Sequence, residues 1–421
     1  MGQGSATNVA GSIESSLARA ADLIDDQPEQ ALALADRLLA RRPGFPPAEL
    51  IAGQALRRLG RSRPALSRLS ALARRQPRVP AVLWELAQAA VDAGDHAKAV
   101  AALEQLTRQQ PAVAAGWFLL GRALRATGRE QDAWRADLSG VHASSRDPTL
   151  LEAAVAMNEG RLDTARDLLE ARRRRLPDDP VGTRLLGEVI WRGGDVSEAL
   201  ALVERAVELA PGFDLARDFL IRLLLQASRL PEALTHADIL RRSPMAMPGH
   251  DLLRASVLVR LGDQEQARAI YDRLLAEQPD QPAVWQNLGH VHKTLGRQAD
   301  AIVAYREAVT RQPTMGEAWW SLANLKTVRL GADDIAAMQG ALDTLAPDAS
   351  ERKLPEHAPV VAEHADGLSA PDGLRDPRRR LVHVGERARV RHARAQHRLE
   401  EAVAGGAHLA LDLPLLPART G

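Results

Sequence analysis

The chain has no cysteine among its 421 residues. This absence excludes disulfides, thiol nucleophiles and thiolate metal sites, and it fits a reducing cytoplasm. Aromatic residues are also scarce, at 3 %, although 45 % of the residues are hydrophobic. Alanine, leucine and valine must therefore supply most of the buried surface, which is typical of many short helices packed closely together. The composition predicts an all-helical protein.

Net charge and long apolar runs are lacking too. The 55 basic residues nearly balance the 54 acidic ones, so no global electric field favours nucleic acid or an anionic membrane. No apolar run approaches the about 18 residues of a membrane-spanning helix, and the N-terminus lacks the basic and apolar segments of a secretory signal. We therefore expect a cytoplasmic protein with neither a nucleic-acid nor a membrane partner.

What is present is a period of 34 residues. A glycine recurs with this period: Gly60, Gly94, Gly128, Gly160, Gly194, Gly262 and Gly296. One interval is 32 residues long, and Ser228 stands at the one position where the glycine is missing. An alanine follows each of these positions by five residues: Ala65, Ala99, Ala133, Ala165, Ala199, Ala233, Ala267 and Ala301. A proline closes most units: Pro43, Pro77, Pro111, Pro177, Pro211, Pro244, Pro279 and Pro313.

Each of these landmarks has a mechanical cause. Glycine suits the left-handed backbone conformation after a helix, alanine lets two helix backbones approach, and proline cannot continue a helix. Periodic apolar runs fill the space between the landmarks, and the turns carry Asp or Arg after the glycine, as in "AGDHAKA" and "LGRQADA". Each unit is therefore predicted to be a helix, a turn and a second helix.

A 34-residue helix pair resembles the tetratricopeptide repeat. The best copy is residues 282–315, where the signature residues of that family occur in order: Trp285, Leu288, Gly289, Ala301, Tyr305, Ala308 and Pro313. Nine units run from about residue 12 to residue 315, and a partial one opens at "EAWWSLANLK". The resemblance implies an all-α, right-handed superhelical solenoid over residues 12–345, followed by a tail.

Catalytic motifs are missing. No HExxH, Walker loop, GxSxG, or GxGxxG in its strand context occurs in the sequence. His290 and His292 are two residues apart on a predicted helix, so they cannot easily share a metal ion. Packing against the neighbouring helix explains the tryptophans near the start of first helices: Trp84, Trp117, Trp285 and Trp319. We expect no enzyme activity from this chain, and no metal or cofactor.

In this repeat family the first helix of each pair lines a concave groove. The resemblance implies ligand contacts at the second, fifth, sixth, ninth, twelfth and thirteenth positions of each repeat. These positions place more basic residues in the groove (Arg57, Arg58, Arg122, Arg125, Arg184, Arg192, Arg222, Arg260 and Lys293) than acidic ones (Glu85, Asp92, Glu188 and Asp218). The most ligand-like polar and aromatic residues lie in the last full unit and its successor: Asn287, His290, Trp320 and Asn324. Two interpretations stay open: a basic groove, or arginines that only keep the helices soluble.

Residues 316–342, "GEAWWSLANLKTVRLGADDIAAMQGAL", carry a second resemblance. They are similar to the join in bacterial proteins that fuse a tetratricopeptide array to a sulfotransferase domain. The resemblance implies that a strand and a Pro-Arg-Ser-Gly-type loop should follow, because the backbone N–H groups of such a loop hold the phosphosulfate donor. The chain shows no such loop, so the catalytic domain is expected to be missing.

Residues 346–421 differ from the repeats in composition. From residue 351 onward they contain eleven arginines, six of the twelve histidines and no aromatic residue, so they offer little from which to build a core. Two interpretations stay open for this segment. It is either the product of a shifted reading frame in a GC-rich gene or an authentic disordered basic tail, and the nucleotide sequence in all three frames distinguishes them.

The sequence thus predicts a non-catalytic scaffold for protein–protein interaction that holds a partner peptide in its concave groove. Because arginines recur there, the expected peptide is acidic or ends in a free carboxylate. The alternative is a truncated or frame-shifted tetratricopeptide-repeat sulfotransferase without its catalytic domain. A third interpretation is an assembly subunit that self-associates through an exposed apolar end of the array.

Overall fold

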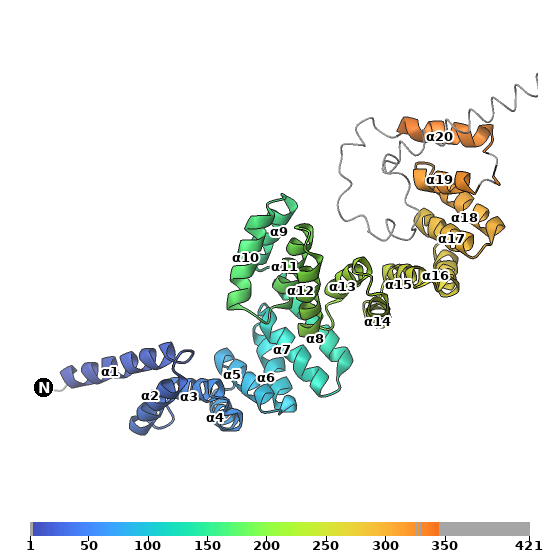
Figure 1. Ribbon diagram of the computed structural model, residues 1–421. Helices are drawn as coiled ribbons and strands as arrows, with labels where there is room; N and C mark the ends of the chain where they lie inside the picture. Colours follow the sequence, from blue (N-terminus) through green and yellow to red (C-terminus); the bar gives the residue numbers. More distant parts are fainter. Residues whose placement is uncertain (1–2, 326, 329, 345–421) are drawn as a thin grey trace, which may run out of the picture. The chain divides into compact units, whose positions relative to one another are not determined.

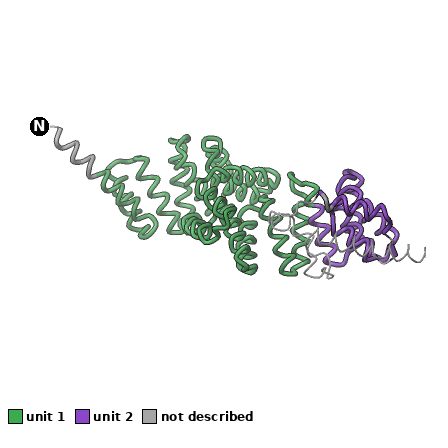
Figure 2. The backbone as a smooth tube through the Cα atoms, turned by 90° about the horizontal axis from the view of Figure 1, so that it is seen from above, with its two compact units in different colours: residues 1–250 green, residues 251–421 purple. Residues whose placement is uncertain are grey.

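The computed structural model describes residues 3–325, 327–328 and 330–344 (Figure 1). Within these residues it has twenty α-helices and no strand, which confirms the all-helical fold expected from the composition. The chain divides into two compact units, residues 1–250 and 251–421 (Figure 2). The predictions for the tail, residues 346–421, lie outside the described residues.

The first unit contains fourteen complete helices, which follow one another with short turns between them. They are α1 (Gln3–Asp22), α2 (Pro28–Arg41), α3 (Pro46–Arg58), α4 (Ser62–Arg75), α5 (Pro80–Asp92), α6 (His96–Gln109), α7 (Ala114–Ala126), α8 (Glu130–Ser144), α9 (Pro148–Asn158), α10 (Leu162–Arg175), α11 (Pro180–Arg192), α12 (Val196–Leu209), α13 (Asp214–Gln226) and α14 (Leu230–Arg241). Helix α15 (Pro248–Leu261) begins at the end of this unit.

The second unit continues the same alternation of helix and turn. Its further helices are α16 (Gln264–Glu277), α17 (Pro282–Thr294), α18 (Gln298–Arg311), α19 (Gly316–Asn324) and α20 (Ala332–Thr344). From α3 onward, odd-numbered helices are the first helices of the predicted pairs and even-numbered helices are the second helices. The helix pairs expected from the 34-residue period are therefore confirmed.

The glycines that mark the period occupy the turn inside each pair. Gly94, for example, has a φ of 77°, in the left-handed region that favours glycine. Ser228 stands where one unit lacks the glycine, and its φ of 58° makes it the one non-glycine residue with a positive φ in the described part of the chain. The Arg229 N–H then donates to the Leu224 carbonyl over 2.9 Å and closes the end of α13.

The residue after each turn glycine decides how the second helix begins. Where it is aspartate, as at Asp95, Asp195 and Asp263, the carboxylate accepts a hydrogen bond from a backbone N–H of the first helical turn. The bond from the Glu198 N–H to Asp195 is 2.9 Å long. Such a cap satisfies one of the donors that a helix start leaves without a partner. Where the residue is arginine, no side-chain cap forms.

Alanine and glycine keep the two helices of a pair close together. The alanine five residues after each turn position has no exposed surface in any of eight units: Ala65, Ala99, Ala133, Ala165, Ala199, Ala233, Ala267 and Ala301. Gly289 of α17 faces Tyr305 of α18, and a Cβ added there would lie 2.5 Å from the tyrosine ring. The small residues of the repeat are therefore required by helix packing.

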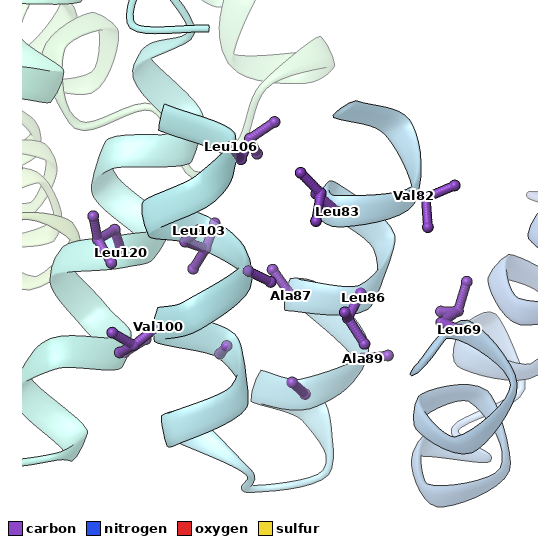
Figure 3. Packing of buried hydrophobic residues seen from close by; sticks show 14 of the residues in the cluster. Leu69, Val82, Leu83, Leu86, Ala87, Ala89, Val100, Leu103, Leu106 and Leu120 are labelled. Atoms are coloured by element: carbon purple, nitrogen blue, oxygen red, sulfur yellow. The ribbon is translucent and has the colours of Figure 1, made fainter. Parts of the chain in front are cut away.

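Second helices also pack on the first helix of the next pair, which joins the pairs into a stack. Figure 3 shows this core around α4 to α7, where Ala87 of α5 lies near Leu103 of α6, Leu86 of α5 points the other way toward α4, and Leu120 of α7 follows. All four side chains are buried. Burial of such side chains contributes about 1.5–3 kcal/mol for each leucine relative to leaving it exposed.

Tryptophan at the fourth position of a unit links it to the unit before. The indole N–H of Trp117 donates to the Pro111 carbonyl over 2.9 Å, and Trp285 and Trp319 make the same bond to the prolines that close their preceding units. These three tryptophans are structural, as predicted. In α13 the same position is Arg217, and its Nη2 donates to the Pro211 carbonyl over 2.7 Å.

The stack is interrupted between α8 and α9. Helices α2, α4, α6, α10, α12, α16 and α18 each pack along the first helix that follows them, whereas α8 makes little contact with α9. The interruption lies at the 32-residue interval, where "LSGVHASSRDP" replaces the usual end of a second helix. Helix α8 is nevertheless a complete helix, and Asp147 caps the start of α9 by accepting from the Thr149 and Leu150 N–H groups.

The face of α8 that would contact α9 in a regular stack is covered by the turn between α12 and α13. Asp137 of α8 is fully buried and accepts a hydrogen bond of 2.7 Å from the Gly212 N–H. A Cβ added to Gly212 would lie 2.9 Å from Trp134, so α8 and this turn are in close contact. The chain therefore turns back at residue 146 and brings α9 to α12 against the pairs before it.

The contact between α8 and α13 is built from buried charges. Five side chains form what we call the buried ionic cluster: Arg125, Asp137, Asp214, Arg217 and His236. Arg125 forms a salt bridge with Asp137, and an Arg217 Nη1 lies 2.9 Å from His236 Nδ1. Burial raises the pKa of the Asp137 carboxyl, although Arg125 and the Gly212 N–H act in the opposite direction. Burial lowers the pKa of Arg217 to about 10, so this residue is still charged at neutral pH.

Candidate functional site

A pocket of about 330 Å³ lies on the first-helix face of the first unit. Its walls come from α3, α5 and α7, and from the turn between α10 and α11. Nine of the lining residues stand at positions of the repeat that the family resemblance assigns to the groove: Arg57, Trp84, Gln88, Val91, Asp92, Ala115, Phe118, Leu119 and Arg122. We take this pocket as the candidate functional site.

Trp84 and Leu119 supply the apolar wall. Trp84 stands at the fifth position of its unit, one residue later than Trp117 and Trp285 in theirs, so it faces the groove instead of the preceding proline. Both side chains are half-buried and pack against the core around α5 and α6. An apolar ligand group can therefore rest on a surface that the core already holds in place.

Four arginines line the pocket, one from α3, one from α7 and two from α10, and they differ in how strongly they are paired. Arg57 is half-buried and lies 3.3 Å from Glu85 and 3.6 Å from Asp92. Arg122 is more exposed, and its nearest acidic oxygen, on Asp178, is 3.9 Å away. Within the described residues, exposed Arg175 has no acidic partner at salt-bridge distance. Arg122 and Arg175 are therefore the cations best able to bind a ligand carboxylate.

The opposite wall is held by Arg172 of α10. Its Nε donates to Asp179 over 2.5 Å and its Nη1 donates to Asp147 over 2.8 Å. These aspartates cap α11 and α9, so one buried guanidinium joins two helix starts. Burial raises the pKa of the Asp147 carboxyl, but the hydrogen bonds from Arg172 and the backbone outweigh it and lower that pKa. This wall is fixed by a hydrogen-bond network as well as by packing.

Several arginines that the repeat positions assign to the groove are paired within the chain. Arg125 forms a salt bridge with Asp137 in the buried ionic cluster. Arg184 and Arg192 both bind Glu188, at 2.9 and 2.8 Å. Arg222 lies 2.8 Å from Asp218 on the next turn of α13. Arg58 is exposed and binds Asp25 at 2.8 Å. These side chains therefore have an intramolecular partner; the pairs with Glu188 and Asp218 are four residues apart on one helix and readable from the sequence, whereas those of Arg125 and Arg58 require the fold.

The remaining predicted residues lie around α15 to α19. His290 Nδ1 is 2.8 Å from the Tyr305 hydroxyl, and the two rings pack edge to face at 5.3 Å. Trp320 is half-buried against the core of α18 to α20, and Asn324 is exposed. The others are half-buried: Arg260, Asn287 and Lys293. A ligand-binding role for these residues stays a prediction.

Sequence reasoning missed Trp84 and Leu119 as site residues. Trp84 was assigned to core packing with the other tryptophans, although its place one residue later in the repeat was the signal that it faces the groove. The contribution of the α10–α11 turn had no such signal. It depends on the interrupted stack between α8 and α9, which brings residues far apart in sequence to one pocket.

The described part of the chain shows no metal cluster and no membrane span. There, no group of three or more His, Cys, Asp or Glu residues is arranged to hold a metal ion. No described helix combines the length and the apolar character needed to cross a membrane.

Among the solved structures that match part of the chain are three repeat proteins. YrrB, described as a tetratricopeptide repeat protein with an unusual peptide-binding site, is 13 % identical, with a TM-score of 0.38 over 45 % of this chain and 97 % of its own. MamA from Desulfovibrio magneticus RS-1 is 15 % identical, with a TM-score of 0.37 over 39 % of this chain and 94 % of its own. A tetratricopeptide repeat protein from Thermus thermophilus is 22 % identical, with a TM-score of 0.35 over 43 % of this chain and 98 % of its own.

Family models give the decisive match. No curated protein sequence matches the chain. Models of the tetratricopeptide repeat match residues 50–102, 85–148, 150–212, 250–291 and 282–315. Together these segments cover more than half of the sequence and overlap α3 to α12 and α15 to α18 of the structure. The chain belongs to the tetratricopeptide repeat family.

Proposed function

We propose that this chain is a non-catalytic scaffold that holds a segment of a partner protein against α3, α5 and α7. One observation carries the proposal: the pocket is made from groove positions of three successive first helices. A stack of helix pairs provides such a surface before the ligand arrives, so little conformational entropy is lost when an extended segment binds.

The pocket chemistry favours a segment with one large apolar side chain beside an acidic group. The apolar side chain rests on Trp84 and Leu119, and the acidic group lies between Arg122 and Arg175. Guanidinium–carboxylate bonds are directional and stronger than bonds between neutral groups. The acidic group is either a side chain or the terminal carboxylate of the partner.

An incoming carboxylate has to compete with Asp178 for Arg122. That contact is long, at 3.9 Å, and the two side chains are 46 % and 63 % exposed. Exposed ion pairs contribute about 0.2–1 kcal/mol, so Asp178 is a weak competitor. Replacement of Asp178 by asparagine should therefore strengthen binding of an acidic segment slightly.

The test is a binding titration with a set of acidic decapeptides that contain one leucine or phenylalanine, each made with a free and an amidated C-terminus. Trp84→Ala, Leu119→Lys and Arg122→Glu should each weaken binding at least tenfold. The matched control is Arg173→Glu with Arg174→Glu, two exposed arginines of α10 outside the pocket lining. Equal loss in the pocket variants and the control would show attraction by bulk charge and would contradict the proposal.

The sulfotransferase alternative rests on the sequence of residues 316–342. Part of this segment forms α19 and α20, and the family matches end at residue 315. If the chain is the repeat half of such an enzyme, the purified chain should not transfer a sulfuryl group, and the missing catalytic domain should be encoded downstream in another reading frame. The peptide titration tests the scaffold function in either case.

A further inference from the structure

Helix α9 lacks the cover of a preceding second helix that seven other first helices have. The face in question consists of the third, seventh and tenth residues of each unit, which lie on one side of a helix. In α7 this face meets α6, because a Cβ added to Gly116 would touch Leu106 and Thr107. In α9 the same positions are Pro148, Glu152 and Val155, and all three are exposed. We call this the open face of α9.

Comparison along the array shows how unusual this exposure is. The tenth residue is at most 9 % exposed in each of the seven first helices that a second helix covers: Ala55, Ala89, Ala123, Val189, Leu223, Val291 and Leu325. Val155 is 51 % exposed, and so is Leu151 beside it. The interruption between α8 and α9 leaves this apolar surface in solvent.

Helix α8 is not available to cover the open face. Its own stacking surface is already in contact with the α12–α13 turn, through the Asp137 bond to the Gly212 N–H and the packing of Trp134 on Gly212. Asp137 is fully buried there, so the contact is not a loose one. Within the described part of the chain, Leu151 and Val155 therefore stay without the cover of a second helix.

We propose that the open face of α9 docks an amphipathic helix of a partner protein, seated as a second helix is seated elsewhere in the array. Seven packed copies of this kind of interface in the same chain define the occupant. It presents small and branched apolar residues three and four positions apart toward Leu151 and Val155. An amphipathic helix that lays its apolar face on a partner is a recurring mode of protein recognition.

Charge adds a second requirement. Glu152 stands in the middle of the open face, where the covered helices carry residues such as Leu86, Leu120 and Leu186. A buried carboxylate without a partner is costly, so the docked helix has to supply an arginine or lysine opposite Glu152. Helix α10 offers a precedent, because its Arg172 lies in the interface with α11 and binds Asp179.

The test uses the full chain and a peptide with the sequence of α10, "LDTARDLLEARRRR", held helical by a side-chain staple. Leu151→Asp and Val155→Asp should each weaken its binding at least tenfold, because they place a charge in the apolar seat. The matched control is Val303→Asp on α18, where the side chain is 58 % exposed. A scrambled stapled peptide of the same charge should bind at least tenfold more weakly than the α10 sequence.

A charge exchange tests the role of Glu152. Glu152→Lys should weaken binding of the α10 peptide and strengthen binding of a version in which glutamates replace Arg172 and Arg173. Equal affinity of the scrambled peptide, or equal losses in Val155→Asp and Val303→Asp, would overturn the proposal. So would an unmodified chain that sediments as a dimer while Val155→Asp is a monomer, because a second copy would then occupy the face.

Discussion

The Asp137 carboxylate of α8 accepts a hydrogen bond of 2.7 Å from the backbone N–H of Gly212, which lies 75 residues later in the chain. This bond joins α8 to the α12–α13 turn and accompanies the loss of stacking between α8 and α9. The pocket wall from the α10–α11 turn depends on the same reversal of the chain. The two candidate surfaces of this protein therefore share one structural cause.

Asp137→Ala should lower the free energy of unfolding by about 3 kcal/mol, because it leaves Arg125 and the Gly212 N–H buried without their acceptor. Chemical denaturation of the full chain measures this change. Asp132→Ala, at an exposed salt bridge on the same helix, is the control and should change the same quantity by less than about 1 kcal/mol. Similar losses in both variants would mean that the buried ionic cluster does not hold α8 in place.

Ser228→Gly should raise the free energy of unfolding by about 0.5–1 kcal/mol. Serine in the left-handed region is strained, and glycine relieves this strain at the cost of a more flexible unfolded chain. Thermal melting, calibrated against denaturant unfolding, detects the gain. The reverse change in an equivalent turn, Gly94→Ser, should lower stability, and a gain there would contradict the explanation.

Stability should fall as the pH drops below about 6.5, in part because of His236. Burial lowers the pKa of His236, and the charge of Arg217 lowers it further, while Glu232 acts in the opposite direction. The unfolded chain therefore binds a proton at this residue before the folded chain does, and the equilibrium shifts toward unfolding. His236→Gln should reduce the slope of stability against pH between 6.5 and 5.5, and an unchanged slope in this variant would contradict the explanation.

Arg172→Met should lower the free energy of unfolding by about 2 kcal/mol, because it removes a buried guanidinium that binds two helix caps. It should also weaken binding of the acidic decapeptides, since the α10–α11 wall loses its tie to Asp147. The exposed neighbour change Arg173→Met tests whether charge alone is responsible. If Arg172→Met bound peptide as well as the unmodified chain does, the wall would not contribute to the site.

Features that depend on local chemistry were predictable from the sequence. The left-handed turns, the Asp caps and the buried alanines follow from residue type and spacing within one unit, and even Ser228 occupies the turn that the period assigned to it. The Trp117 bond to Pro111 also repeats with the period.

Features that depend on contacts between distant units were not. Arg125 stands at a groove position, but the fold places its charge in a salt bridge with Asp137 of α8, and Arg192 of α11 also donates to the Met157 carbonyl of α9. The shortened interval near residue 146 marked an irregular unit without revealing that α8 would pack on residues near 212. Trp84 is an intermediate case. Its position in the repeat could be read from the sequence, but only the fold shows that its side chain is half-exposed in the pocket wall.

The central claim is that a partner segment binds over the pocket between α5 and α7, and the absence of cysteine permits a direct measurement. Leu119→Cys places a single thiol in the pocket wall, and Val303→Cys places one on α18. The rate of alkylation of each thiol is measured as an acidic decapeptide that binds the unmodified chain is added. We predict that the peptide slows alkylation at position 119 in proportion to its occupancy and leaves the rate at position 303 unchanged; an unchanged rate at position 119 under saturating peptide would contradict the account.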